Sequence, residues 1–576
     1  MTQEHSRQTE SEEHAAPSEK NSAVSHDPDT AVARASLPGP EATANGVTEK
    51  LFQASSKVGL ALPAVLLAAQ VWYGFVGTAL YSPLEAEYIL LYKQLSTSGQ
   101  WLVTSFGDSA YWPVFVWFLA GLAKVLAHFA MPQNLLFPAA AALSTFLALC
   151  GVYSLSRAAG FGAQAALAAC LILLCSPFFA LLSHALTADA LGAALLLCSL
   201  ACFCNGLQKE RAWIALPLAF ALAALAGLTG GGFYALLPLL TSLIFLVWTG
   251  TFRHRHAPDV LFGFALFLLC VAVWLGCLIL FTHSDTYVQS LCNTLLIFPL
   301  RPPAHWWLSF AFTGVGLLPW LMLVLCVSWN RVLLSAVRDL KASRGERAGS
   351  SFVWIALGIG YGLSLIAPES TGKVDFFPIC LAALLLGKAL LNLSKLGIRI
   401  FCALLALCLL CAGSALIAAG FDVSLNYMTN FLPFPITYEL RDSIGALTSL
   451  PIFGAIFLVA ALVFMTFRQS GPGGTLLVCA LLAIALAQPA MLRLAPELRK
   501  TIVSLKPADA VTLPQSVAPA QNDEPADKDE SAGKDEPANP VPPFTPTPVV
   551  PETEPAPTPP FALPETDSAT PSAPIP

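Results

Sequence analysis

Two glutamates, Glu85 and Glu87, stand two positions apart in the stretch YSPLEAEYILLYKQLSTSGQW, residues 81–101. This stretch is the first long polar interruption after the first strongly apolar segment, which places the two acids at the end of a helix. A carboxylate in such a position can deprotonate or orient a hydroxyl group of a substrate. The same two acids could equally form only the solvated rim of the helix. Local sequence leaves both interpretations open.

The composition of the chain determines what kind of protein holds these acids. Of its 576 residues, 56% are hydrophobic and only 11% are charged, and the mean hydropathy is +0.67. Soluble domains carry about 25% charged residues, so one large soluble protein is excluded. Apolar segments of about 20 residues, each long enough to span a bilayer, recur from residue 57 to residue 493. The sequence therefore predicts an all-α polytopic membrane protein.

Both ends of the chain differ from its middle. Residues 1–55 have no apolar run and many acids, serines and alanines, which predicts a disordered cytoplasmic tail. Residues 501–576 are rich in proline, alanine and acids, a composition that resists packing and favours extended conformations. We expect residues 56–500 to form the membrane domain. The net charge of −6 comes largely from acids in the tails, so it says nothing about nucleic acid.

The apolar segments and the basic loops between them predict a topology. Lysine and arginine are enriched in cytoplasmic loops, so the basic stretches 251–256, 330–347 and 387–399 should face the cytoplasm. Fourteen apolar candidates can be counted in the sequence, but fourteen full crossings would put the first polar loop on the wrong side. One candidate in 111–155 must therefore fail to cross, which leaves about 13 transmembrane helices.

A few further ionisable groups lie at or near membrane depth, where such groups are costly and often functional. Asp189 stands near the start of an apolar helix, Lys373 lies in a short external loop, and Arg301 and His305 belong to the external loop 283–305. Each also has a plainer interpretation. An acid is stabilised at a helix N-terminus by the helix dipole, a lysine can snorkel to the interface, and the tryptophans after His305 are typical of an aromatic belt.

The 15 cysteines do not indicate a metal site or a disulfide framework. Most lie inside apolar segments, where a free cysteine behaves as a small hydrophobic residue. Cys408 and Cys411 have CxxC spacing, but within FCALLALCLLCAG they are expected to pack or to face lipid. The sequence predicts no metal ligands.

The order of several segments resembles the C-type membrane glycosyltransferases, which include protein O-mannosyltransferases and the aminoarabinose transferases of lipid A. SPLEAEYILLYKQLSTSGQW is similar to the first external loop of that superfamily, which reads roughly P-D-E-A-R-Y and then forms an amphipathic helix. AYWPVFVW is similar to its K-P-P segment, and LTADALG to its T-D-A helix start. AALAGLTGGG, GLLPWL and STGKVDFFP match its L-T-K-G, L-L-P-W and S-x-G-K segments. The resemblance covers roughly residues 60 to 390.

The resemblance implies a membrane enzyme that moves a sugar from a polyprenyl-phosphate-linked donor to a lipid, glycan or protein acceptor. It further implies transfer at the outer face of a bacterial inner membrane, and a divalent cation as a possible cofactor. Glu85 would be the first candidate for the catalytic acid and Glu87 the second. Residues expected to bind substrate are Tyr88, Asp189, Arg301, His305 and Lys373.

This chain departs from the superfamily pattern at several charged positions. Leu84 stands where the family has its aspartate, and Glu87 where it has an arginine. The K-P-P lysine corresponds to Tyr111 or Trp112, and the L-T-K-G lysine falls at Gly230 or Gly231. Fewer cations are therefore expected to meet a departing lipid phosphate.

These losses leave two alternatives to an active transferase. The first is a non-catalytic relative that binds lipid-linked glycans or scaffolds an envelope assembly. The second is a transporter or flippase, which the sequence disfavours because its two halves show no internal repeat. Neither the sugar nor the acceptor can be identified from the residues.

Overall fold

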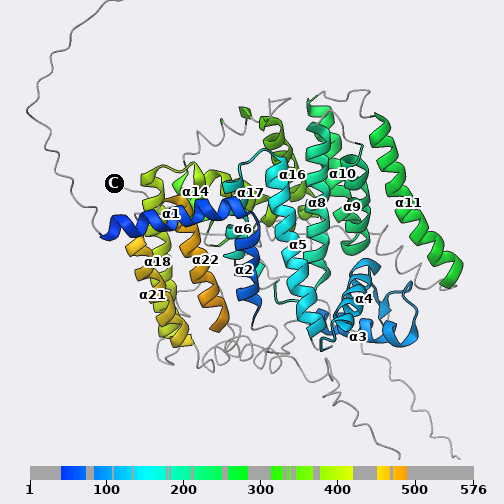
Figure 1. The fold of residues 1–576 in the computed structure, drawn as a ribbon, viewed down its shortest axis with the longest axis horizontal. Helices are drawn as coiled ribbons and strands as arrows, with labels where there is room; N and C mark the ends of the chain where they lie inside the picture. The colour runs from blue at the N-terminus through cyan, green and yellow to red at the C-terminus, as the bar shows by residue number, and fades with distance from the viewer. Residues whose placement is uncertain are drawn as a thin grey trace, which may run out of the picture. The chain divides into compact units, whose positions relative to one another are not determined.

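A computed structural model describes most of the membrane domain. The described residues are 40–72, 83–106, 109–132, 135–176, 179–180, 183–208, 213–249, 257–282, 346–366, 376–419, 450–467 and 471–489, with short pieces between 310 and 338. The described residues are helical apart from one short hairpin, as predicted (Figure 1). The first part of the chain forms α1 (Pro40–Val58), α2 (Ala61–Val71), α3 (Pro83–Ser98), β1 (Ser105–Phe106), β2 (Ser109–Ala110), α4 (Pro113–His128), α5 (Leu136–Ala158), α6 (Ala163–Leu174) and α8 (Ala188–Gln208).

The second part of the chain is also helical. It forms α9 (Ala215–Gly230), α10 (Gly232–Thr249), α11 (Ala257–Thr282), α14 (Met322–Cys326), α16 (Glu346–Ile366), α17 (Phe376–Leu391), α18 (Lys395–Ala419), α21 (Leu450–Phe467) and α22 (Pro472–Pro489). Within the described residues six helices are long and apolar enough to cross a membrane, or seven if a bent pair is counted as one span. Several further apolar helices are shorter.

Helix α8 is the centre of the helical packing. It packs against α5, α9, α10, α16 and α17, and 78% of its most apolar stretch is buried inside the protein. Helix α11 is its opposite, since only 17% of the corresponding stretch is buried. An all-round apolar helix is expected either in a core or against lipid, and these two helices illustrate the two cases.

Helix α1 lies in a region for which the sequence indicates a tail up to residue 55. It is followed by a turn at Gly59, whose φ of +71° is easily adopted only by glycine. The axis bends there by 103°, so that α1 runs nearly at a right angle to α2. Figure 1 shows α1 lying across the ends of α22 and α6, which it contacts.

Helix α4 resolves the topological conflict. Its 16 residues extend about 24 Å, which is less than the roughly 30 Å of a bilayer core. Trp112, just before α4, lies against Gly231 between α9 and α10, and the last turn of α4 is followed within eight residues by α5. Gln208 at the end of α8 hydrogen bonds to the carbonyl oxygen of Ala158 at the end of α5, so α5 and α8 run in the same direction.

Both ends of α4 therefore lie at the starting end of α5 and α8. We conclude that α4 does not cross the membrane, as the sequence predicted for one candidate in 111–155. Figure 1 shows α4 beside α3 at that end of the bundle.

Helices α18 and α21 cross at two glycines. A Cβ atom built on Gly413 would lie 2.8 Å from the carbonyl oxygen of Gly454, and one on Gly454 would lie 2.6 Å from the carbonyl oxygen of Gly413. Small residues allow such close approach of helices inside a membrane, where packing rather than the hydrophobic effect drives association.

We predict that Gly413→Leu lowers the melting temperature of the purified protein, because overpacking costs about 1–3 kcal/mol. The measurement is thermal unfolding in detergent. Gly276→Leu is the matched control, since a Cβ at Gly276 meets nothing within 4 Å. Equal melting temperatures for the two variants would contradict the prediction.

Candidate active site

Helix α3 and the hairpin after it form one side of the candidate site. The helix begins at Pro83, a residue suited to the first turn, and ends before Gly99, whose φ is +70°. Gly99 N–H donates to the carbonyl oxygen of Leu95, 2.9 Å away, which closes the last turn. Strands β1 and β2 then pair antiparallel, with Ser105 opposite Ala110. The amphipathic helix that the sequence predicted for this loop is confirmed.

The hairpin fixes Tyr111. Its N–H donates to the carbonyl oxygen of Thr104 at 2.7 Å, and the Thr104 hydroxyl donates to the carbonyl oxygen of Tyr111 at 2.5 Å. These bonds extend the strand pairing by one residue and hold the ring over α3. The Tyr111 hydroxyl donates a hydrogen bond to Oε2 of Glu87. Glu87 therefore faces the hairpin and α4.

Tyr88 is the buried centre of this region. Its ring makes edge-on contacts with Tyr111, with centroids 5.5 Å apart, and with Phe115 on α4, with centroids 4.9 Å apart. Tyr88 is only 3% exposed. Burial, followed by the charges of Asp189, Tyr111 and Glu87, raises the pKa of Tyr88 well above its usual value of 10.0.

Asp189 brings α8 into the same cluster. It lies in the first turn of α8 and is buried. Its neighbours Leu186, Ala188 and Leu191 pack in one apolar cluster with Tyr88. An acid in the first turn is stabilised by the helix dipole, and this structural role is compatible with a second role toward a ligand.

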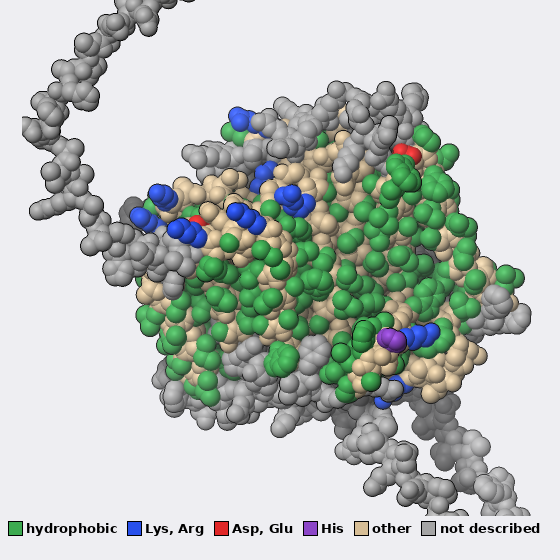
Figure 2. Space-filling model, viewed as in Figure 1, with side chains coloured by type: hydrophobic (Ala, Val, Ile, Leu, Met, Phe, Trp, Pro, Cys, Tyr) green, Lys and Arg blue, Asp and Glu red, His purple; other side chains and the backbone are tan. Residues whose placement is uncertain are grey.

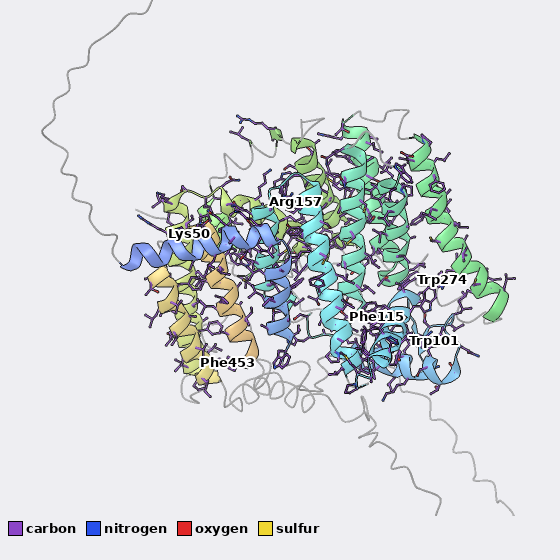
Figure 3. All side chains as sticks on the ribbon, in the orientation of Figure 1. Lys50, Trp101, Phe115, Arg157, Trp274 and Phe453 are labelled. Carbon is purple, nitrogen blue, oxygen red and sulfur yellow. The ribbon has the colours of Figure 1, made fainter. Side chains whose placement is uncertain are left out.

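The structure thus brings together three of the residues that the sequence selected. Glu87, Tyr88 and Asp189 meet at the end of the bundle where α3, α4 and α8 pack (Figure 3 labels Phe115 and Trp101 there). Glu85 lies on α3, but its side chain is outside the described part of the structure. Arg301, His305 and Lys373 also lie outside the described residues.

Sequence reasoning did not select Tyr111 as a functional residue. Its position, two residues before Pro113, made it only one of two candidates, with Trp112, for a missing lysine. Its pairing with Thr104 depends on a hairpin of two residues per strand, which is too short to give a strand pattern. An aromatic residue two positions before a helix-opening proline, in a loop that carries acids, is the signal that could have found it.

A second aromatic group lies beside the cluster. The ring centroids of Trp112 and Trp274 are 6.1 Å apart, and Nε1 of Trp112 would lie 3.2 Å from a Cβ atom built on Gly231. Trp274 belongs to α11 and is buried. The tryptophan at one lost lysine position therefore contacts the glycine at the other.

A divalent cation needs several oxygen or nitrogen ligands. Among the described residues no group of three His, Cys, Asp or Glu side chains could hold a metal ion. The described part of the site offers Glu87 and Asp189 as carboxylates near Tyr88. These two do not by themselves make a metal site, and we derive no step through a metal.

Comparison with known proteins gives the fold a counterpart. Residues 109–276 match the family model described as dolichyl-phosphate-mannose-protein mannosyltransferase. The structure is similar to ArnT from Cupriavidus metallidurans in the apo state, with a TM-score of 0.58 and 19% identity over 79% of this chain and 78% of that chain. The undecaprenyl phosphate complex of the same protein gives a TM-score of 0.56 and 19% identity over 80% of this chain and 78% of that chain.

No curated protein matches the chain in the comparison. The partial family match and the shared fold confirm the predicted resemblance to the C-type membrane glycosyltransferases.

We predict that Tyr88→Phe makes the protein less sensitive to alkaline pH. The pKa of Tyr88 is raised in the folded protein. Its contribution to the free energy of unfolding is therefore fully present below about pH 10. It is lost as the pH rises further, where only the unfolded state gives up the proton. One such proton changes stability by up to about 1.4 kcal/mol per pH unit.

Melting temperatures measured at about pH 9 and about pH 11 test this, because they bracket the unperturbed tyrosine value. The melting temperature of the wild type should fall more than that of the variant between about pH 9 and about pH 11. An equal loss in both proteins would show that Tyr88 does not titrate as its burial implies.

Proposed function

We propose that this protein transfers a sugar from a polyprenyl-phosphate-linked donor to an acceptor, at the end of the bundle formed by α3, α4 and the start of α8. The observation that carries the proposal is the packing of α3 against the start of α8: Glu87 is bonded to Tyr111, and Tyr88 beside it shares one apolar cluster with the residues that flank Asp189. These elements are separated by about a hundred residues of sequence, so the fold brings them together. The fold is similar to that of ArnT, whose structure has been solved bound to undecaprenyl phosphate.

Each group has a chemical task in this proposal. Glu87 is half-buried and is oriented by the Tyr111 hydroxyl, so it can take a proton from the acceptor hydroxyl as the new glycosidic bond forms. Asp189 is buried in the first turn of α8, where a carboxylate oxygen can accept a hydrogen bond from a sugar hydroxyl. Tyr88 remains a neutral phenol because ionisation is disfavoured where it is buried.

Glu85 remains the other candidate for the base. It lies two positions before Glu87 on α3. Residues two apart on a helix point in different directions, so only one of the two is expected to face the acceptor. We place the base at Glu87 because its bond to Tyr111 aims it toward the hairpin.

Leaving-group stabilisation requires positive charge near the phosphate of the donor. The groups that act on Tyr88 in the described structure are all acids. We assign binding of the donor phosphate to Arg301, His305 and Lys373. These residues belong to loops that the sequence predicts to be external. The acceptor is a lipid, glycan or protein hydroxyl, and the reaction takes place at the outer face of a bacterial cell membrane.

One observation favours a second function, binding of a lipid-linked glycan without transfer. Trp112 contacts Gly231, so an indole fills space where the resemblance would place lysines. An aromatic surface there binds a ligand by contact rather than by charge, and it stabilises a departing phosphate poorly. Donor binding without turnover is the outcome that this alternative requires.

We predict that Glu87→Gln reduces sugar transfer by about 100-fold or more, because general base catalysis contributes about 10²–10⁴-fold. Asp189→Asn should reduce it as well, and Glu85→Gln should reduce it least of the three. The measurement is turnover of a polyprenyl-phospho-sugar donor by purified protein in lipid, with donor binding measured in parallel.

Asp259→Asn is the matched control, since Asp259 is an acid in the first turn of α11, away from the cluster at α3. It should retain wild-type turnover. Full activity of both Glu87→Gln and Asp189→Asn would overturn the site assignment. A wild type that binds donor tightly and never transfers it would favour the second function.

A further inference from the structure

The amphipathic helix α1 takes no part in the proposed site, yet it is firmly attached to the bundle. A carboxylate oxygen of Glu49 accepts a hydrogen bond from the N–H of Gly474, 3.0 Å away at the start of α22. Phe52 is fully buried, and a Cβ atom on Gly473 would lie 2.2 Å from its ring. The glycines of the GPGG stretch thus allow α1 to lie directly on α22.

This attachment determines which side of α1 is buried. Successive residues of an α-helix are about 100° apart around the axis. Thr48, Phe52 and Ser56 lie on the face that meets the bundle, of which Phe52 and Ser56 are buried. The remaining surface is presented outward and cannot turn inward while Glu49 and Phe52 hold the helix.

The outward surface of α1 carries two parallel rows. Lys50 and Lys57, two turns apart, are both exposed and form a basic row. Leu51 and Val58, also two turns apart, form an apolar row beside it and are 52% and 66% exposed. A fixed helix that exposes a basic row beside an apolar row is typical of one lying in a membrane interface.

The direction of α1 agrees with that interpretation. Helix α2 follows it at an angle of 103° and enters the bundle. A helix nearly perpendicular to one that enters the membrane runs along the membrane surface. Helix α1 lies at one end of the bundle. A Cβ atom built on Gly59, in the turn after α1, would lie 3.4 Å from the hydroxyl of Tyr153, which is in the last part of α5.

Other basic residues lie at the same end. Arg157 is exposed in the last turn of α5, and Lys388 lies over the ring of Phe161, just beyond α5, at 4.6 Å. Lys395 begins α18 and is exposed. Figure 2 shows Lys and Arg side chains gathered along this end, above a largely hydrophobic flank, and Figure 3 labels Lys50 and Arg157 there.

We infer that α1 is an interfacial helix whose outward face binds the anionic phospholipid headgroups of the leaflet at this end of the bundle. Lys50 and Lys57 contact the phosphates, with Arg157 continuing the basic surface. Leu51 and Val58 insert among the upper acyl carbons. The partner is an anionic lipid surface, because cationic side chains are attracted to a negative leaflet. The apolar row indicates a lipid rather than a free phosphate, because a free phosphate has no acyl chains for it to contact.

The test uses the full-length protein purified in a zwitterionic detergent. Phosphatidylglycerol is titrated in, lipid retention is measured by native mass spectrometry, and the melting temperature is followed. The wild type should retain phosphatidylglycerol and melt at a higher temperature as it is added. The double variant Lys50→Gln, Lys57→Gln should lose about half or more of that increase, because each lysine near an anionic surface contributes separately.

The double variant Lys93→Gln, Lys124→Gln is the matched control. It removes two exposed lysines from α3 and α4 at the other end of the bundle, and it should keep most of the response. Leu51→Gln, Val58→Gln should lower retention of the lipid as well. Melting temperatures equal to wild type without added lipid show that each variant is folded.

Three outcomes would overturn the inference. The first is an equal response of the wild type and the Lys50, Lys57 variant. The second is an equal response to phosphatidylcholine, which would show that binding does not depend on the negative charge of the headgroup. The third is the same stabilisation by soluble glycerol phosphate, which would indicate an ion site rather than a lipid surface.

Discussion

The burial of Tyr88 is the contact on which the candidate site depends. Its ring packs on Tyr111 and Phe115, and one apolar cluster joins it to the residues around Asp189. This one side chain joins α3 and α4 to the start of α8, which is distant from both in sequence. Because the phenol is buried, its ionisation is disfavoured, and the acids around it can hold charge without a third charge between them.

The short helix α4 makes that contact possible. A full crossing would carry the end of α4 to the other side of the membrane, and Phe115 and the start of α5 could not then both lie near Tyr88. Instead, α4 begins and ends at the same end of the bundle, where α5 and α8 start. The hairpin and Pro113 set its starting direction, since Tyr111 is fixed to Thr104 on both of its backbone groups. The polar loop thus becomes a packed platform.

The charges at the two ends of the bundle are suited to different contacts. At the end of α3, Glu87 and Asp189 raise the pKa of Tyr88, while Lys93 and Lys124 are exposed on α3 and α4. At the end of α1, Lys50, Lys57 and Arg157 are exposed, and the carboxylate of Glu49 accepts a hydrogen bond from the start of α22. A carboxylate can take a proton from an acceptor hydroxyl, and cationic side chains are attracted to an anionic leaflet.

The sequence by itself determined the class of this protein. Charge content and apolar run length depend only on composition and order, so the all-α membrane fold, the amphipathic α3 and the non-crossing segment in 111–155 could all be predicted. The order of short motifs indicated a resemblance to the C-type membrane glycosyltransferases, and Glu87, Tyr88 and Asp189 were among the residues that it selected. The end of the first tail was misjudged, because α1 has its apolar face interrupted by lysines and resembles a solvated segment.

Only the tertiary structure decided which residues meet. The bond from Tyr111 to Glu87, the contact of Trp112 with Gly231 and the attachment of Glu49 to Gly474 join positions 24, 119 and 425 residues apart. Periodicity reports on neighbours along one helix and contains no information about such distances. They follow from how helices pack, which depends on the shapes of many side chains at once.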